Sequence, residues 1–497
     1  MDLIREMSNI LEQDLPKSFN LIIPKGSKLR KLYKLALETT LSERDIASEL
    51  YQSDPGDKRF LMLKGNLINK LSELVLIANH SDINRKNYIK VKFQCEKQLT
   101  IAKKLLFVNV YHNAEKMTKK VLKQAQQYEL VDVERECYNT LRKIYYLKGF
   151  SAETRKYQKL TEIKFDESRL LDKLKGLMEI ALADTKFIRS QSSLLSESYA
   201  EDLAFIIKQS KNPENAFFQI YKMRIQLIIF HQSNNINRWE TTLETLGQLL
   251  QKCPYLETEH FILEANISKI KYLIATHEYV DIYSVLDRLI INTSYKSFNR
   301  FEVMAEAFQL EMHLGNFNNA TKILEEVSST VQYPMLDKRD RAAWSLRAAY
   351  CKYLHPKASV SPQLFDVNDL HEFYGTCAGI SKDKTGYNLQ FVIIRTLQLY
   401  QTDRLDYASE VNNLKVYFQR YLKGNEGERT KAFYKSLSRL VMSNFCLDTF
   451  ETESDRLKPL LSAHAEALEY CEIIRYETLW VKVGHVIAEK QRAKAAV

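Results

Sequence analysis

Residues 301–327 read FEVMAEAFQLEMHLGNFNNATKILEEV, and they contain the pattern that decides the fold class. In the first half, large apolar side chains recur at steps of three and four residues, which places them on one face of a helix. These side chains are Phe301, Met304, Phe308 and Met312. Gly315 and Asn316 then break the pattern, because both residue types favour turns. The stretch therefore predicts a helix that ends in a tight turn.

The same spacing recurs far away in the chain. One stripe consists of Leu63, Leu67, Leu71, Leu74 and Ala78, and another of Val133, Cys137, Leu141 and Ile144. Short turns, for example at 148–151, 212–213 and 253–254, support pairs of helices of about 15–20 residues each. Residues 222–227 alternate in polarity and residues 391–394 form a β-branched run; we interpret both as buried helix. The sequence predicts an all-α fold, a right-handed solenoid of antiparallel helix pairs.

The domain organisation follows from where this pattern is interrupted. We expect an N-terminal helical segment over 1–90, a helical-repeat stack over 91–354 and a C-terminal helical stack over 387–497. Between the stacks, residues 355–386 collect Pro, Gly, Ser and Asp, which predicts an irregular connection or a functional loop. A smaller exposed turn is expected at 423–428.

Composition supports a folded helical chain. Hydrophobic residues make up 45% of the 497 positions, whereas the chain has only 13 Gly and 9 Pro, far too few for many tight turns. The formal net charge is +10, and residues 51–150 hold 19 basic against 10 acidic residues. This local excess predicts either a solvated lysine-rich surface or attraction to nucleic acid, anionic lipid or an acidic protein.

Location in the cell is predicted from three absences. The N-terminus from Met1 to Glu6 lacks the basic segment followed by an apolar run that a secretory signal needs, and Glu6, Glu12 and Asp14 interrupt it, so no secretory signal is expected. No stretch has the roughly 18 uncharged apolar residues that span a bilayer. The seven cysteines are scattered and never form a C-x-x-C pair, which is typical of a reducing compartment. We therefore expect a cytoplasmic protein without a membrane span.

Residues 305–334 resemble a tetratricopeptide repeat. The first helix ends at Gly315, Phe317 opens the second, and Ala320, Leu324 and Val327 follow at the family's spacing. Weaker echoes lie at 277–286 and 405–408, and no strict period of about 34 residues is kept. The resemblance implies stacked helix pairs with a concave surface that takes up a peptide or a partner helix. It transfers no site residue to this chain.

Residues 29–74 resemble a helix-turn-helix or winged-helix reader of DNA. Ser42 to Asp45 reads as a capping box that opens a second helix, in which Ile46, Ala47 and Leu50 match the apolar triplet of such motifs. Lys58 and Arg59 would open the third helix and are the candidate DNA contacts. The loop 52–57 is longer than in the simple motif, so three helices that cap the stack are the alternative interpretation.

Catalytic signatures are missing from the sequence. There is no glycine-rich phosphate loop, no H-E-x-x-H pair and no G-x-S-x-G turn, so we predict no catalytic residue, no metal and no cofactor. Interleaved basic and aromatic residues, as needed to bind single strands, are represented only by Lys90, Lys92 and Phe93.

Two functional hypotheses follow. The first is a non-enzymatic helical-repeat scaffold that binds a protein or peptide in a concave groove. The second is a DNA-binding regulator with residues 28–80 as reader and the repeats as sensor or dimerisation arm, for which nucleic acid would bind through residues 51–150. A third, an enzyme with its site in 355–387, has only the irregularity of that segment as support.

Overall fold

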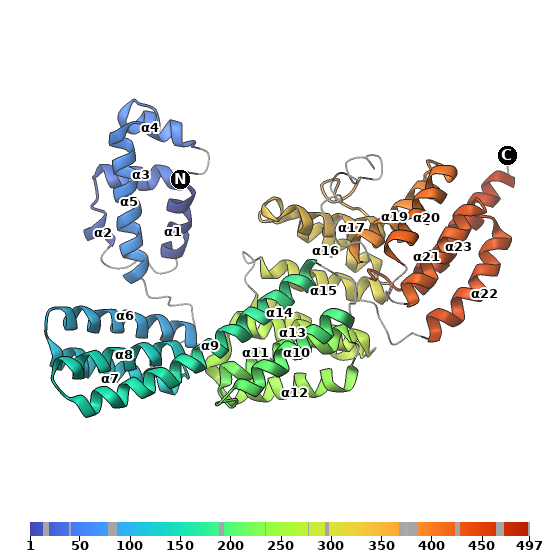
Figure 1. Cartoon of the computed structure of the whole chain (residues 1–497). Helices are drawn as coiled ribbons and strands as arrows, with labels where there is room; N and C mark the ends of the chain where they lie inside the picture. Colours follow the sequence, from blue (N-terminus) through green and yellow to red (C-terminus); the bar gives the residue numbers. More distant parts are fainter. Residues whose placement is uncertain are drawn as a thin grey trace. The chain divides into compact units, whose positions relative to one another are not determined.

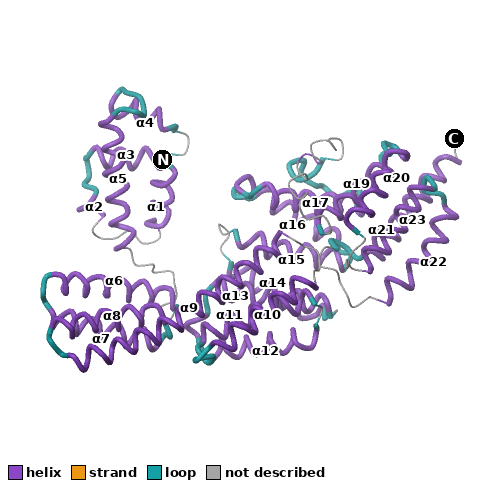
Figure 2. Tube along the Cα trace, viewed as in Figure 1, coloured by secondary structure: helices purple, strands orange, loops and turns teal. Residues whose placement is uncertain are grey.

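The computed structural model describes residues 1–12, 19–38, 41–77, 87–187, 193–233, 235–276, 278–293, 298–366, 373, 375, 386–422, 428–463 and 472–495. Every regular element in these ranges is a helix, so the predicted all-α class is confirmed (Figures 1 and 2). The chain divides into two compact units, Met1–Tyr128 and Glu129–Val497. The sequence-based boundary at 90 and 91 falls inside a helix. Most of the predicted irregular segment from 367 to 385 lies outside the described residues, as do 423–427.

The first unit contains seven helices in the described ranges. They are α1 (Asp2–Glu12), α2 (Phe19–Ile22), α3 (Lys28–Leu37), α4 (Glu43–Tyr51), α5 (Lys58–Ile77), α6 (Tyr88–Phe107) and α7 (Tyr111–Gln127). In the stripe predicted over 63–78, Leu67, Leu71 and Leu74 are fully buried in the core that α5 shares with α1 to α4, and Ala78 lies outside the described residues. The helices α6 and α7 pack on each other as an antiparallel pair.

The second unit continues the same design, because most of its helices pack on their neighbours along the chain. Its helices are α8 (Val131–Leu147), α9 (Ser151–Phe187), α10 (Ser193–Gln209), α11 (Ala216–Gln232), α12 (Ile236–Lys252), α13 (Glu259–Ala275), α14 (Tyr279–Asn292), α15 (Asn299–His313), α16 (Phe317–Ser329), α17 (Lys338–Leu354), α19 (Tyr387–Gln401), α20 (Tyr407–Tyr421), α21 (Glu428–Met442), α22 (Leu447–Ala463) and α23 (Tyr476–Ala495). Two short 3₁₀ turns lie at Pro254–Leu256 and Tyr333–Met335. The two stretches with ambiguous periodicity, 222–227 and 391–394, are helical, as predicted.

Helix α9 departs from the expected length of about 15–20 residues, since it runs for 37 residues and packs in turn on α8, α10 and α11. No glycine or proline occurs between Gly149 and Gly176, and nothing else in that stretch ends a helix. Gly176 does not end the helix either, because one glycine costs only about 1 kcal/mol relative to alanine. The predicted helix length of about 15–20 residues is therefore wrong for α9.

Several helices end in a residue with left-handed backbone conformation, followed by the next helix within a few residues. Gly315 has φ of 75°; its N–H donates to the carbonyl of Met312, and the N–H of Asn316 donates to that of Glu311. This pair of bonds is the Schellman arrangement, which satisfies two of the last free carbonyls of a helix. Equivalent pairs of bonds follow α6, α8, α19 and α21, with Asn109, Gly149, Asp403 and Asn444 at the left-handed position.

The repeat-like pair predicted over 305–334 has the expected helices. The first ends at His313 and the second begins at Phe317. Ala320, Leu324 and Val327 are fully buried between the two helices and their neighbours. These observations confirm the pair itself. The resemblance to tetratricopeptide repeats remains a prediction about the whole stack.

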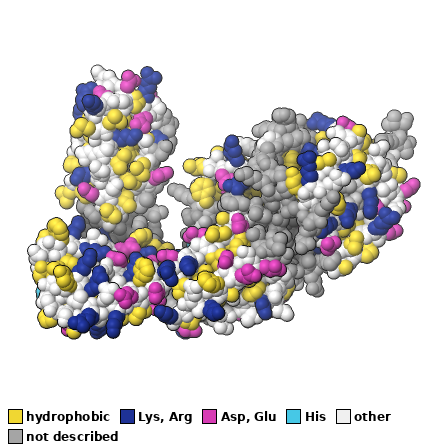
Figure 3. Space-filling view, in the orientation of Figure 1, with side chains coloured by type: hydrophobic (Ala, Val, Ile, Leu, Met, Phe, Trp, Pro, Cys, Tyr) yellow, Lys and Arg dark blue, Asp and Glu magenta, His cyan; other side chains and the backbone are white. Residues whose placement is uncertain are grey.

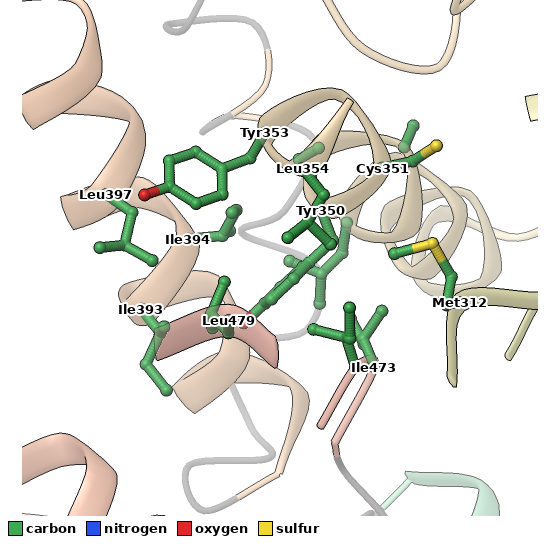
Figure 4. Close-up of a cluster of buried hydrophobic side chains, with 14 of the residues drawn as sticks. Met312, Tyr350, Cys351, Tyr353, Leu354, Ile393, Ile394, Leu397, Ile473 and Leu479 are labelled. Atoms are coloured by element: carbon green, nitrogen blue, oxygen red, sulfur yellow. The ribbon is translucent and has the colours of Figure 1, made fainter. Parts of the chain in front are cut away.

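The largest core of the second unit gathers side chains from helices that are far apart in sequence. Figure 4 shows Met312 of α15 and Tyr350 of α17 together with Ile394 of α19 and Leu479 of α23. Two tyrosines in this core differ in how their hydroxyls are paired. The Tyr350 hydroxyl donates to Oε1 of Gln390 at 2.7 Å, whereas the fully covered Tyr353 hydroxyl has no hydrogen-bond partner in the described structure.

A buried ion network joins α21 to the segment that opens α23. Arg429 is 2% exposed; its Nε donates to Glu472 at 2.9 Å and its Nη2 to Glu477 at 2.8 Å. Its Nη1 also donates to the carbonyl of Leu461 in α22. Burial raises the pKa of Glu472, and the guanidinium of Arg429 opposes that effect. The same segment reaches α15, because the amide of Gln309 donates to the carbonyl of Glu472.

Removal of this cation tests the network. We expect Arg429→Ala to lower the free energy of unfolding by about 3–5 kcal/mol, because it leaves a fully buried carboxylate without its partner. The control Arg456→Ala removes a 61% exposed partner of Glu453 and should cost less than about 1 kcal/mol. All three tryptophans lie in this unit, so urea unfolding followed by tryptophan fluorescence measures both variants.

The pH dependence of the same variant has a definite sign. Without Arg429, burial and the nearby charge of Glu477 hold the pKa of Glu472 above its unfolded value, so folding binds a proton. The contribution of this proton to the free energy of unfolding is present at low pH, and it is lost as the pH rises through the folded pKa of Glu472 and the carboxyl ionises. The deficit relative to wild type should therefore be larger at about pH 8 than at about pH 5. An equal deficit at both values would contradict a buried, uncompensated carboxylate.

The two core tyrosines give a second matched test. Tyr353→Phe removes an unpaired buried hydroxyl and should leave stability unchanged or raise it by about 1 kcal/mol. Tyr350→Phe removes a hydroxyl that pairs with Gln390 and should lower the stability by about 0.5–1.5 kcal/mol. Urea midpoints of the two variants provide the measurement, and a shift in the same direction for both would contradict the assignment of these hydroxyls.

Candidate interaction surfaces

The predicted DNA contacts lie at the start of α5. Lys58 is exposed, and Arg59 is engaged locally, because its Nη2 lies 2.7 Å from Oδ2 of Asp57. The guanidinium of Arg59 also lies over the ring of Tyr51, 5.2 Å from its centroid, and Lys28 lies over the same ring at 4.5 Å. The hydrogen bonds from Arg59 lower the pKa of Asp57. Lys58 and Arg59 are thus adjacent at the surface, and the charge of Arg59 is compensated by Asp57.

The helices that precede α5 have the predicted local structure. Ser42 and Asp45 form the expected capping box at the start of α4, with the Ser42 N–H donating to Oδ2 of Asp45 at 2.9 Å. Ile46 and Ala47 are fully buried in the core of α1 to α5, and Leu50 packs against its edge. A three-helix packing unit of α3, α4 and α5 is therefore present. Its resemblance to a DNA reader remains a prediction.

The basic excess is most concentrated on the α6–α7 pair. Residues 88–127 hold nine lysines, no arginine and two glutamates. The two glutamates each form an ion pair within their own helix: Glu96 with Lys92 at 4.0 Å and Glu115 with Lys119 at 2.7 Å. Figure 3 shows dark blue basic side chains next to yellow hydrophobic ones in the area of these helices. The pair therefore carries a strong positive charge.

One side of α6 combines lysines with large apolar side chains. The buried side of the helix consists of Val91, Cys95, Leu99 and Ala102. At 3.6 residues per turn the opposite side consists of Lys90, Phe93, Lys97, Ile101 and Lys104, which we call the outer face of α6. Phe93 is 54% exposed and Ile101 43% exposed. Basic and apolar residues thus alternate along a single line.

The outer face leads into an apolar turn between α6 and α7. Phe107 is 88% exposed and Val108 60% exposed, and Asn109 follows in the left-handed conformation that ends the helix. Large apolar side chains at such exposure in neighbouring positions are typical of interaction surfaces rather than of ordinary solvated helices.

The sequence contains part of the signal for this surface. Lys90, Lys92 and Phe93 alone are too few to predict it, but Lys97 and Lys104 continue the same line along α6. Lys90, Lys97 and Lys104 are spaced by seven residues, which keeps them on one side of a helix. Exposure of the apolar residues between them is a structural fact that spacing alone does not provide.

A cavity of about 270 Å³ lies in the second unit between α9, α10 and the start of α11. Its charged lining is largely paired, since Lys211 lies 3.5 Å from Asp166 and Glu167 lies 2.8 Å from Lys164. The lining residues are Val131, Asp166, Glu167, Arg169, Leu170, Leu171, Gln209, Ser210, Lys211, Asn212, Asn215 and Phe218. These lining residues include no histidine or cysteine.

Among the residues that the structure describes, no cluster of three or more His, Cys, Asp or Glu side chains is arranged to hold a metal ion. None of the described helices has the length and apolar character that crossing a membrane requires. Comparison with known protein families, with curated proteins and with solved structures gave no match.

Proposed function

We propose that this chain is a non-enzymatic helical-repeat scaffold that binds a protein or peptide partner. The observation that carries the proposal is the outer face of α6 with its apolar turn, where Phe93, Ile101 and Phe107 are exposed to solvent. Apolar groups of this size are costly in water, and a partner protein that covers them gains roughly 25 cal/mol for each Å² removed from solvent.

The proposed scaffold extends through the second unit. Helix pairs that pack on their neighbours and reverse at left-handed turns support a right-handed superhelix with a concave groove, in which a partner can also lie. No disulfide joins the described cysteines, and burial raises the pKa of Cys95 to about 11 and also raises that of Cys351. The lack of disulfides among these residues supports the proposed cytoplasmic location.

Partner capture tests the proposal directly. The tagged full chain, expressed in cells of its source, is cross-linked, purified and analysed by quantitative mass spectrometry beside an unrelated helical protein of equal charge. We expect at least one protein to be recovered in near-stoichiometric amount with this chain and not with the control. If the purified chain retains no protein and instead converts a small molecule, the proposal is wrong.

A DNA-binding regulator is the second candidate function. The specific observation in its favour is a three-helix unit of α3, α4 and α5 with Lys58 exposed at the start of α5. Helix N-termini carry a partial positive charge, so a lysine there adds to the attraction for a phosphate. The reader would be residues 28–80, with the helical repeats as sensor or dimerisation arm.

This candidate predicts a steep dependence of duplex affinity on salt, with log K falling by about 0.9 for each phosphate contacted per decade of salt. Lys58→Glu combined with Arg59→Glu should weaken binding of the full chain by roughly tenfold or more and reduce that slope. The control, Lys415→Glu with Lys458→Glu, makes the same charge change at exposed sites in the second unit. A gel-shift titration without binding at low salt, or with equal losses in both variants, would rule the candidate out.

A further inference from the structure

The outer face of α6 has a regular geometry. Lys90, Lys97 and Lys104 are seven residues apart, which corresponds to roughly 10.5 Å along a helix that rises 1.5 Å per residue. Phe93 lies between the first two lysines and Ile101 between the last two. A partner that fits this face therefore has carboxylates about seven residues apart, with apolar side chains between them.

We propose that the outer face of α6 is a docking surface for an acidic amphipathic helix of the partner protein. This inference rests on the proposed scaffold function and names the kind of partner it binds. A helix with apolar residues and Asp or Glu at alternating three- and four-residue steps places its apolar groups on Phe93 and Ile101 and its carboxylates beside the lysines. Charge complementarity selects an acidic helix over a basic one.

The placement of the lysines argues against a membrane surface as the occupant. A helix that lies in a bilayer interface keeps its lysines at the flanks of an apolar face, so that the ammonium groups reach water. Here Lys97 stands between Phe93 and Ile101, on the line that would enter the bilayer. In that orientation its charge would be drawn toward the hydrocarbon together with its neighbours.

The aliphatic side chains of this surface argue against nucleic acid. Lysines of this spacing can contact phosphates, but Ile101 and Val108 have neither the aromatic face on which a base stacks nor a hydrogen-bonding group. These side chains would stay uncovered or face the charged backbone. An amphipathic protein helix uses both kinds of side chain on this face.

The docking surface is held in place before a partner arrives. Val91, Cys95 and Leu99 are buried on the opposite side of α6, and Cys95 also lies 3.8 Å from the amide oxygen of Gln124 in α7. Binding therefore orders the partner but not α6 itself, which lowers the entropic cost on this side of the interface.

Defined peptides test the inference on the full chain. The first probe is a fluorescent synthetic helix of about 20 residues, the length of α6, with Leu and Glu alternating at the contact positions. The second replaces each Glu with Gln, and the third replaces each Glu with Lys. Vesicles that contain phosphatidylserine and a single-stranded oligonucleotide are the further probes. Fluorescence anisotropy and vesicle sedimentation measure binding over a range of salt concentrations.

Two pairs of variants locate the contact. Lys97→Glu with Lys104→Glu reverses the charge of the outer face and should weaken binding of the Glu peptide by roughly tenfold or more. Lys120→Glu with Lys123→Glu makes the same charge change at exposed positions of α7 and should change it by less than about twofold. Phe93→Ala with Ile101→Ala should weaken both the Glu and the Gln peptides, since it removes apolar contact.

The outcomes separate this inference from the scaffold function. Tighter binding of the Glu peptide than of the Gln and Lys peptides, lost only in the outer-face variants, supports the inference. Equal binding of all three peptides, equal losses in both lysine pairs, or binding of vesicles or oligonucleotide without binding of the Glu peptide overturns it. If a captured cellular partner still binds the Lys97→Glu, Lys104→Glu variant at full strength, the scaffold function stands and the α6 surface is wrong. If no partner is captured at all, the scaffold function itself fails.

Discussion

The fold depends on how its helices end. A helix leaves its last carbonyls without donors, and a residue in the left-handed conformation lets the following two N–H groups return to them. The chain leaves that turn in the reverse direction, and the next helix starts within a few residues, as at Gly315 and Asn109. Successive helices are therefore antiparallel, and their apolar stripes, such as the one that ends at Met312, pack against each other.

The residue at the left-handed position of these turns affects the conformational energy of the backbone. Glycine adopts positive φ without a steric penalty, whereas Asn109, Asp403 and Asn444 adopt it at some cost that their short polar side chains reduce. Tertiary packing offsets the remainder. At the end of α8, the rings of Tyr145 and Phe150 lie 6.2 Å apart and give the apolar contact that accompanies this type of helix end.

Periodicity and turn residues were enough to predict the helical class, the pair at 305–334 and the capping box at Ser42. They failed on the length of α9, because the absence of a turn residue is a weaker signal than its presence. The outer face of α6 was overlooked for a different reason. A pattern of seven predicts which residues share a side, but exposure of Phe93 and Ile101 depends on what else packs there, and this is decided by tertiary structure.

The ion network at Arg429 was also invisible in sequence. Its carboxylates are 43 and 48 positions further along the chain, and no local pattern links them to the guanidinium. Burial of a charge requires its partners to be in place, because an isolated ion in the interior is strongly disfavoured.

The distance in sequence between Arg429 and its carboxylates affects how the chain folds while it is being made. A chain is made from its N-terminus, and domains generally fold as units once their parts are present. Arg429 is made 43 and 48 residues before Glu472 and Glu477, so it has no carboxylate partner until they have been translated. Because an unpaired buried ion is strongly disfavoured, we expect the guanidinium to stay hydrated until then. We therefore expect the C-terminal helices to complete their core together, once the segment that opens α23 has been made.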